Sequence, residues 1–220
     1  MSVASVRAGI VAACARVGRE PDSVRLVGVS KGHEPDEIER VLLVEGVRDL
    51  AENRVQAWRE KVDVLPNDVT WHFIGSLQRN KVKYLAARGV AWVHSLNSVR
   101  LAEELERQGA RHDHVFRVLI EVNVAGEDAK QGVRPEDVGA LLDAARPLEH
   151  VQVRGLMAMA PFSDEPEDAR PTFQTLASLA DTWGLEERSM GMSGDFEVAI
   201  EEGATMVRVG SALFTSKATG

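Results

Sequence analysis

The sequence predicts an α/β fold: a single (β/α)8 barrel of the TIM type, with an extra helix in front of the first strand. Two observations carry this prediction. Short apolar or β-branched runs alternate with segments of helical periodicity, which is typical of parallel strands joined by crossover helices. Eight such runs are present, the number that closes this kind of barrel. The alternative is an open, doubly wound sheet built from the same units.

The elements follow in order along the chain. An amphipathic helix over residues 3–18 precedes the first strand, as a lid or plug would. Strands are expected at residues 24–30, 47–51, 70–75, 90–95, 115–124, 151–157, 185–191 and 205–210. The seventh run, LEERSMG, is the least typical of a strand because it carries three charges. Pro35 and Pro135 precede acidic residues and mark helix starts, where proline loses no hydrogen bond.

Net charge, cysteine content and the length of apolar runs exclude several classes of function. The formal net charge of -8 argues against nucleic acid, because binding to its backbone requires clustered cations. The single cysteine, Cys14, allows no internal disulfide and is expected on the first helix. No run approaches the roughly 20 apolar residues of a membrane span, and no leader segment is evident, so no membrane contact and a cytoplasmic location are expected. No linker interrupts residues 1–220, which are expected to form one domain.

In a barrel of this kind the chemistry gathers where the strands end. Glycine before a helix start leaves backbone N–H groups open to an anion, and the loops after the seventh and eighth strands are the usual phosphate site. One lysine follows the first strand. The candidate residues at the strand ends are Lys31, Asn53, Ser193, Arg208, Gly210 and Ser211.

A phosphate group together with a lysine on a neighbouring strand end indicates an aldehyde cofactor held as an imine, and pyridoxal 5′-phosphate matches this layout. Simpler roles stay open at this point. Ser193 could cap a helix, Gly210 could serve a tight turn, and Arg208 could lie on the surface. Asp195 argues against an anion at the seventh loop, since its carboxylate would repel it. His72 and His94 are expected to be hydrogen-bonded structural residues, and no metal site is expected.

Seven motifs add a family resemblance. The chain resembles the pyridoxal phosphate homeostasis protein family over residues 24–214, through the segments VGVSK, ENRVQ, WHFIGSLQRNK, VNVAGEDAKQGV, RGLMAMAP, SMGMSGDFEVAI and MVRVGSALF. The resemblance implies a fold-type III barrel similar to the N-terminal domain of alanine racemase. It further implies a Schiff base of the cofactor on Lys31. By the same resemblance, Ser193, Gly210 and Ser211 contact the phosphate, Arg208 lies beside the ring or phosphate, and Asn53 lines the pocket.

Three functions remain as hypotheses. The favoured one is a non-catalytic carrier that buffers pyridoxal phosphate and passes it to apo-enzymes. An amino-acid racemase needs a proton acceptor on each face of the substrate, and in proteins similar to alanine racemase a second domain of a partner subunit supplies a tyrosine. Here Tyr84 is the only tyrosine, it falls in the third crossover helix away from the strand ends, and the chain is expected to end after the barrel, which makes a monomer plausible. Arg208 near the ring nitrogen would also weaken the cofactor as an electron sink. The third hypothesis is an aldolase-type barrel in which Lys31 binds a sugar phosphate.

Overall fold

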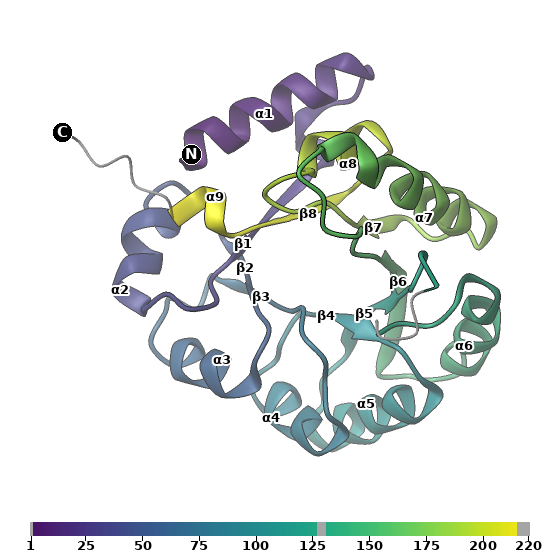
Figure 1. Cartoon of the computed structure of the whole chain (residues 1–220). Helices are drawn as coiled ribbons and strands as arrows, with labels where there is room; N and C mark the ends of the chain where they lie inside the picture. Colours follow the sequence, from purple (N-terminus) through teal and green to yellow (C-terminus); the bar gives the residue numbers. More distant parts are fainter. Residues whose placement is uncertain (1, 127–130, 215–220) are drawn as a thin grey trace.

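The computed structural model describes residues 2–126 and 131–214, and its strands form a closed parallel barrel (Figure 1). The order β1-β2-β3-β4-β5-β6-β7-β8 returns to β1, with Arg25 opposite Met206 and Gly28 opposite Val209. This pairing confirms the barrel and excludes the open sheet. Part of the VNVAGEDAKQGV segment, residues 127–130, lies outside the described residues.

All eight predicted strands are present. Their bounds are β1 Arg25–Val29, β2 Asp49–Glu52, β3 Thr70–Phe73, β4 Trp92–Leu96, β5 Phe116–Glu121, β6 Val151–Met157, β7 Glu187–Ser189 and β8 Met206–Val209. The charged seventh run gives a strand of only 3 residues. Its charges are satisfied at the strand start, where Thr205 Oγ1 donates to Glu187 Oε2 at 2.7 Å and Arg188 pairs with Asp181.

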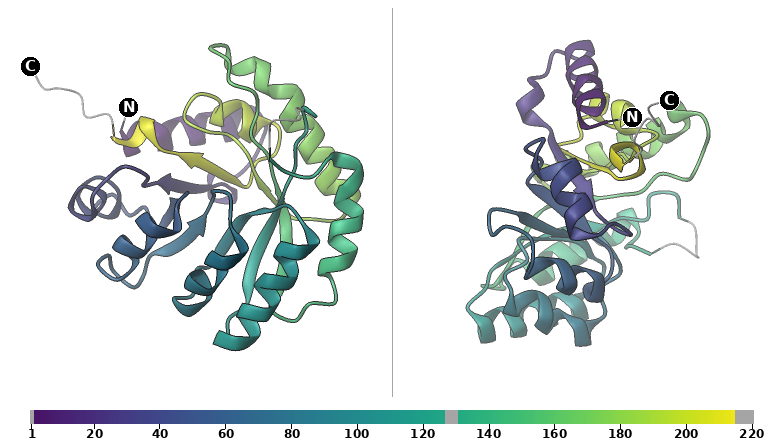
Figure 2. Two further views of the ribbon diagram at one scale, coloured as in Figure 1. Left: turned by 60° about the horizontal axis from the view of Figure 1, so that its bottom comes forward. Right: turned by 90° about the vertical axis from the view of Figure 1, so that its left-hand side faces the viewer.

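Helices follow the strands and surround them (Figures 1 and 2). Pro35 begins one of them, as predicted, and Pro135 begins a 3-10 turn that leads into another. The helices are α1 Val3–Arg16, α2 Pro35–Ile38, α3 Val55–Val62, α4 Val82–Ala87, α5 Val99–His112, α6 Val138–Ala145, α7 Arg170–Thr182, α8 Phe196–Glu201 and α9 Ser211–Phe214. Within the described residues, none of them has the length and apolar character needed to cross a bilayer.

The additional helix α1 packs in the outer layer of the barrel. It lies against α8 (Figure 1), where Arg16 pairs with Glu197 at 2.8 Å and with Glu201 at 2.5 Å. Gly9 permits this contact, since a Cβ there would lie 2.9 Å from the ring of Phe196. Cys14 is buried on the same helix. The expectation of a lid or plug was therefore wrong: α1 covers the outside of the barrel rather than one of its ends.

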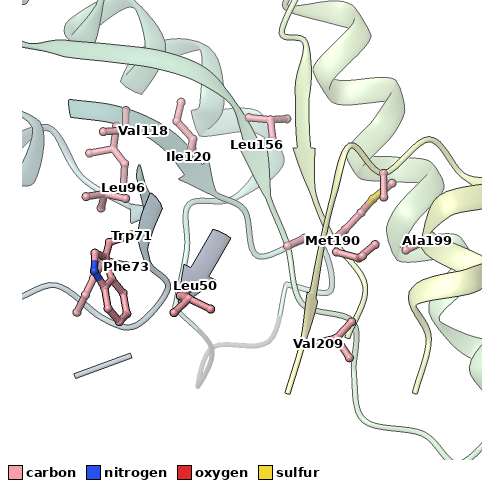
Figure 3. Packing of buried hydrophobic residues seen from close by; sticks show 14 of the residues in the cluster. Leu50, Trp71, Phe73, Leu96, Val118, Ile120, Leu156, Met190, Ala199 and Val209 are labelled. Atoms are coloured by element: carbon pink, nitrogen blue, oxygen red, sulfur yellow. The ribbon is translucent and has the colours of Figure 1, made fainter. Parts of the chain in front are cut away.

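Strand alternation separates two apolar layers. Successive side chains of a strand point to opposite faces of the sheet. The outward set packs under the helices and includes Leu50, Phe73 and Val209 (Figure 3). The inward set fills the barrel and consists of Val27, Val29, Ala51, Trp92, Leu119, Met157 and Met206. The inward set fixes which residues, further along each strand, face the mouth of the barrel.

Candidate functional site

Most of the candidate residues lie at one end of the barrel, where the strands end. Lys31 lies in the turn two positions beyond Val29, the last residue of β1, and Asn53 directly follows the last residue of β2, so both stand at the same end of the barrel. Arg208 lies two positions beyond Met206, which places it and then Gly210 on the same face. Because parallel strands end on the same rim, these four residues lie at one rim of the barrel.

The end of β1, just before Lys31, lies beside the loop after β8. The strands β1 and β8 pair with each other, and a Cβ added to Gly210 would lie 3.3 Å from Val29 Cβ. The Lys31 side chain is exposed, and within the described part of the chain it has no hydrogen bond or ion pair. The structure therefore places the turn that carries Lys31 beside the loop that carries Gly210.

The loops after β7 and β8 form a small cradle of backbone donors. The N–H groups of Gly210 and Ala212 both point at Ser193 Oγ, at 3.3 and 3.4 Å. Asp195, not Ser193, is the N-cap residue of α8, whereas Ser193 accepts from two N–H groups at the start of α9. Ser211 begins α9 in the same loop. Two donors that converge on one oxygen have the arrangement that binds an oxyanion.

Arg208 is buried rather than superficial. Arg208 is 4% exposed. Its Nη1 donates to Ser189 Oγ at 2.6 Å, and its Nη2 donates to the Ala158 carbonyl at 3.1 Å. Burial lowers the pKa of Arg208 to about 10, and Asp195 and Glu121 counteract this effect. The guanidinium is consequently a fixed positive charge at neutral pH, aimed from the interior of the barrel toward its mouth.

A buried chain of hydrogen bonds leads from Arg208 across the barrel. Ser189 Oγ lies 2.9 Å from His94 Nδ1, His94 Nε2 lies 2.9 Å from His72 Nδ1, and His72 Nε2 lies 2.9 Å from Asp49 Oδ1. A guanidinium can only donate and a carboxylate can only accept, so the two ends fix every proton between them. Both histidines carry the proton on Nε2, and all donors point from Arg208 toward Asp49.

His72 and His94 are both neutral. Burial lowers the pKa of His72 and lowers that of His94 further, and the hydrogen bond to Asp49 raises only the former. The prediction of structural, hydrogen-bonded histidines is confirmed. Their link to Arg208 could not be predicted from the sequence, because it depends on the packing of β3, β4 and β7 across the barrel.

A second buried pair holds the residue before Lys31. Lys61 of α3 is 6% exposed and donates to Glu52 Oε1 and, at 2.7 Å, to the Ser30 carbonyl. Ser30 Oγ also donates to Glu52 Oε1 at 3.2 Å. These contacts fix the end of β1, and hence the start of the Lys31 turn. Sequence reasoning missed this pair, although Lys61 stands three residues after the buried Trp58, in the inward stripe of its helix.

The turn that carries Lys31 also packs against α9. The rings of His33 and Phe214 stack with centroids 3.6 Å apart and an angle of 9° between their planes. His33 Nδ1 lies 2.9 Å from Glu37 Oε2, which orients the imidazole. The amine turn and the cradle loop are therefore joined by a side-chain contact as well as by strand pairing.

Asn53 faces a small cavity between α3 and α4. The cavity has a volume of about 220 Å³, and Ser76 and Tyr84 also line it. The Tyr84 ring is surrounded by cations, with Arg59 Cζ at 4.6 Å and Lys83 Nζ at 5.1 Å from its centroid. Tyr84 lies in the third crossover helix as predicted, but it shares a cavity with strand-end residues and is thus nearer the mouth than expected.

A second cavity has no part in this arrangement. It has a volume of about 470 Å³ and is lined by Leu142 and Val151, which belong to α6 and the start of β6, and by Trp183. This is the rim opposite the candidate residues, since the strands begin there. Among the described residues, no group of three or more metal-ligating side chains occurs.

Comparison with known proteins agrees with this architecture. Residues 6–218 match the family model described as alanine racemase, N-terminal domain. The pyridoxal phosphate homeostasis protein of Deinococcus radiodurans is 48% identical over 214 residues, which cover 97% of this chain and 100% of that protein. PipY of Synechococcus elongatus, solved with PLP bound, is 34% identical with a TM-score of 0.77, over 93% of this chain and 99% of PipY. An alanine racemase from Clostridium difficile shares the fold, with 16% identity, a TM-score of 0.72, and 100% of this chain matched to 58% of the racemase.

Fold and family model together define a barrel of the alanine racemase N-terminal type. Within that class, the relatives that match over nearly the full length are more specific. The chain belongs to the pyridoxal phosphate homeostasis protein family. The resemblance predicted from its seven motifs is confirmed.

Lys61→Met is expected to destabilise the protein by about 3–5 kcal/mol, because it leaves the Glu52 carboxylate buried without its cation. Urea unfolding followed by circular dichroism measures this loss. The double variant Glu52→Gln/Lys61→Met is the control, and we expect it to recover most of the stability. A single variant as stable as the wild type would show that the pair does not hold the end of β1.

Ser189→Ala is expected to destabilise the protein by about 1–3 kcal/mol, because it leaves donors of Arg208 and an acceptor of His94 unpaired in the barrel interior. Ser95→Ala is the matched control: Ser95 is 1% exposed, and its Oγ has no partner within the described part of the chain. Chemical unfolding of both variants tests the difference. Equal losses would contradict the continuous chain from Arg208 to Asp49.

Proposed function

We propose that this protein binds pyridoxal 5′-phosphate at the mouth of the barrel and acts as a non-catalytic carrier that buffers the cofactor. In this proposal Lys31 provides the amine that holds the aldehyde, and Ser193, Gly210 and Ser211 receive the phosphate. Arg208 faces the ring or the phosphate from inside the barrel, and Asn53 lines the wall of the pocket. The observation that supports it most is the adjacency of an unpaired lysine and a cradle of two converging N–H donors.

The donor set fits this cofactor. Two backbone N–H groups and one hydroxyl suit a phosphate oxygen, and the buried guanidinium of Arg208 adds a positive charge nearby. The cofactor supplies an aldehyde that condenses with an amine with loss of one water. The protein positions the groups that bind the cofactor. Lys61 fixes the backbone before Lys31, and the hydrogen bond to Ser189 orients the Arg208 guanidinium.

The orientation of Arg208 favours a carrier over a racemase. Its guanidinium is held by Ser189 and the Ala158 carbonyl and remains charged, so an adjacent ring nitrogen would be kept unprotonated. A ring without that proton stabilises carbanions poorly. Tyr84, the only tyrosine of the chain, has its ring covered by Arg59, Lys81 and Lys83. These two features support binding and release rather than proton abstraction.

The protein acts in the cytoplasm as a monomeric single domain over residues 1–220, and its partners are the small-molecule cofactor and the apo-enzymes that receive it. The net charge of -8 supports the absence of nucleic acid from this list.

Borohydride reduction of the protein loaded with pyridoxal phosphate is expected to attach a pyridoxyl group to the peptide that contains Lys31. Mass spectrometry of the digest locates the adduct. Lys31→Ala is expected to abolish it, whereas Lys83→Ala, which removes another exposed lysine, is expected to retain it. An adduct on another peptide would contradict the assignment of the amine. Turnover of amino acids at ordinary enzymatic rates, lost in Lys31→Ala, would favour the racemase instead.

A further inference from the structure

Glu121 is an acidic residue at the mouth that neither the motifs nor the proposed binding set uses. It ends β5, and it lies two positions beyond Leu119, which belongs to the inward set. Its side chain therefore faces the interior at the same rim as Lys31 and Arg208. In the closed order of strands, β5 is opposite β1, so Glu121 faces the ligand space from the side across from the amine.

The carboxyl of Glu121 is buried, and its hydrogen bonding is incomplete among the described residues. The residue is 5% exposed, and its Oε2 has no hydrogen-bond partner within the described residues. Buried polar atoms in proteins are nearly always paired, and an unpaired one needs an explanation. Its backbone carbonyl, in contrast, accepts from Val133 N–H at 2.8 Å. The main chain at this position is satisfied, and only the side chain is left without a partner.

Burial of Glu121 favours its neutral form, whereas the nearby cation favours the ionised form. Burial raises the pKa of Glu121, and the Arg208 guanidinium only partly offsets this effect. Asp195, the other acid that interacts with Arg208, has its pKa raised by burial as well. When it is protonated, a carboxyl is a hydrogen-bond donor, and a buried donor requires an acceptor.

We propose that Glu121 is a ligand-contacting residue whose carboxyl donates to a ring heteroatom of the bound aldehyde the hydrogen bond that it lacks in the protein. This inference rests on the proposed function. The cradle takes the phosphate and Lys31 takes the aldehyde, so the acceptors left on an aromatic phosphate aldehyde of this kind are its ring nitrogen and phenolic oxygen. Glu121 and Arg208 together would then recognise the ring itself.

The test measures the affinity for pyridoxal phosphate by absorption titration in three variants. Glu121→Gln keeps a donor and is expected to bind within about threefold of the wild type, whereas Glu121→Leu is expected to bind at least about tenfold more weakly, the loss of one hydrogen bond. Gln108→Leu, another buried residue with an unpaired oxygen but on the outer helix α5, is expected to bind like the wild type. Equal affinity of Glu121→Leu and the wild type would overturn the proposal.

Two further readouts separate ligand contact from a structural role. Inorganic phosphate, a probe of the cradle alone, is expected to bind Glu121→Leu and the wild type equally. The unfolding temperature of the ligand-free Glu121→Leu protein is expected to match or exceed that of the wild type, because the substitution removes a buried unpaired carboxyl. Loss of phosphate binding or a lower unfolding temperature would contradict the proposal. If the wild type itself fails to bind pyridoxal phosphate, the proposed function fails, whatever the variants do.

Discussion

The pairing of β8 with β1 is the constraint on which the rest of the site depends. Arg25, Leu26, Val27 and Gly28 are in register with Met206, Val207, Arg208 and Val209, so the last loop of the chain ends beside the first. Gly210 allows this approach because any side chain there would press on Val29. Without the closure, the amine and the backbone donors would lie on opposite edges of an open sheet. With it, they become the two sides of one small mouth.

The interior of the barrel is polarised along a single direction. Arg208 and Asp49 are its charged ends, and the neutral His94 and His72 transmit the hydrogen bonds between them. A buried charge is costly unless it is hydrogen-bonded. These hydrogen bonds stabilise the Arg208 cation below the mouth, where it attracts an anionic ligand. The counter-charge lies at the half-buried Asp49 near the other rim.

Much of the architecture could be predicted from the sequence, because strand and helix periodicities and the count of eight units are local properties. The candidate residues could also be named, since strand ends are recognisable and SMGMSG and RVGS carry small residues. What could not be predicted depends on contacts between distant segments. The Lys61–Glu52 pair and the chain through His72 and His94 require the packed barrel, and α1 gave no local sign of whether it covers an end or a side. Glu121 escaped notice because a strand-end acid is ordinary until its burial and its unpaired oxygen are known.

The central claim is that Lys31 and the cradle of Ser193 and Gly210 hold one ligand between them. A crystal structure of the protein with pyridoxal phosphate tests it most directly. We expect electron density that continues from Lys31 Nζ into the ligand, with phosphate oxygens within hydrogen-bond distance of Ser193 Oγ and the Gly210 amide. Density for the ligand at another rim or cavity, with Lys31 unmodified, would contradict it.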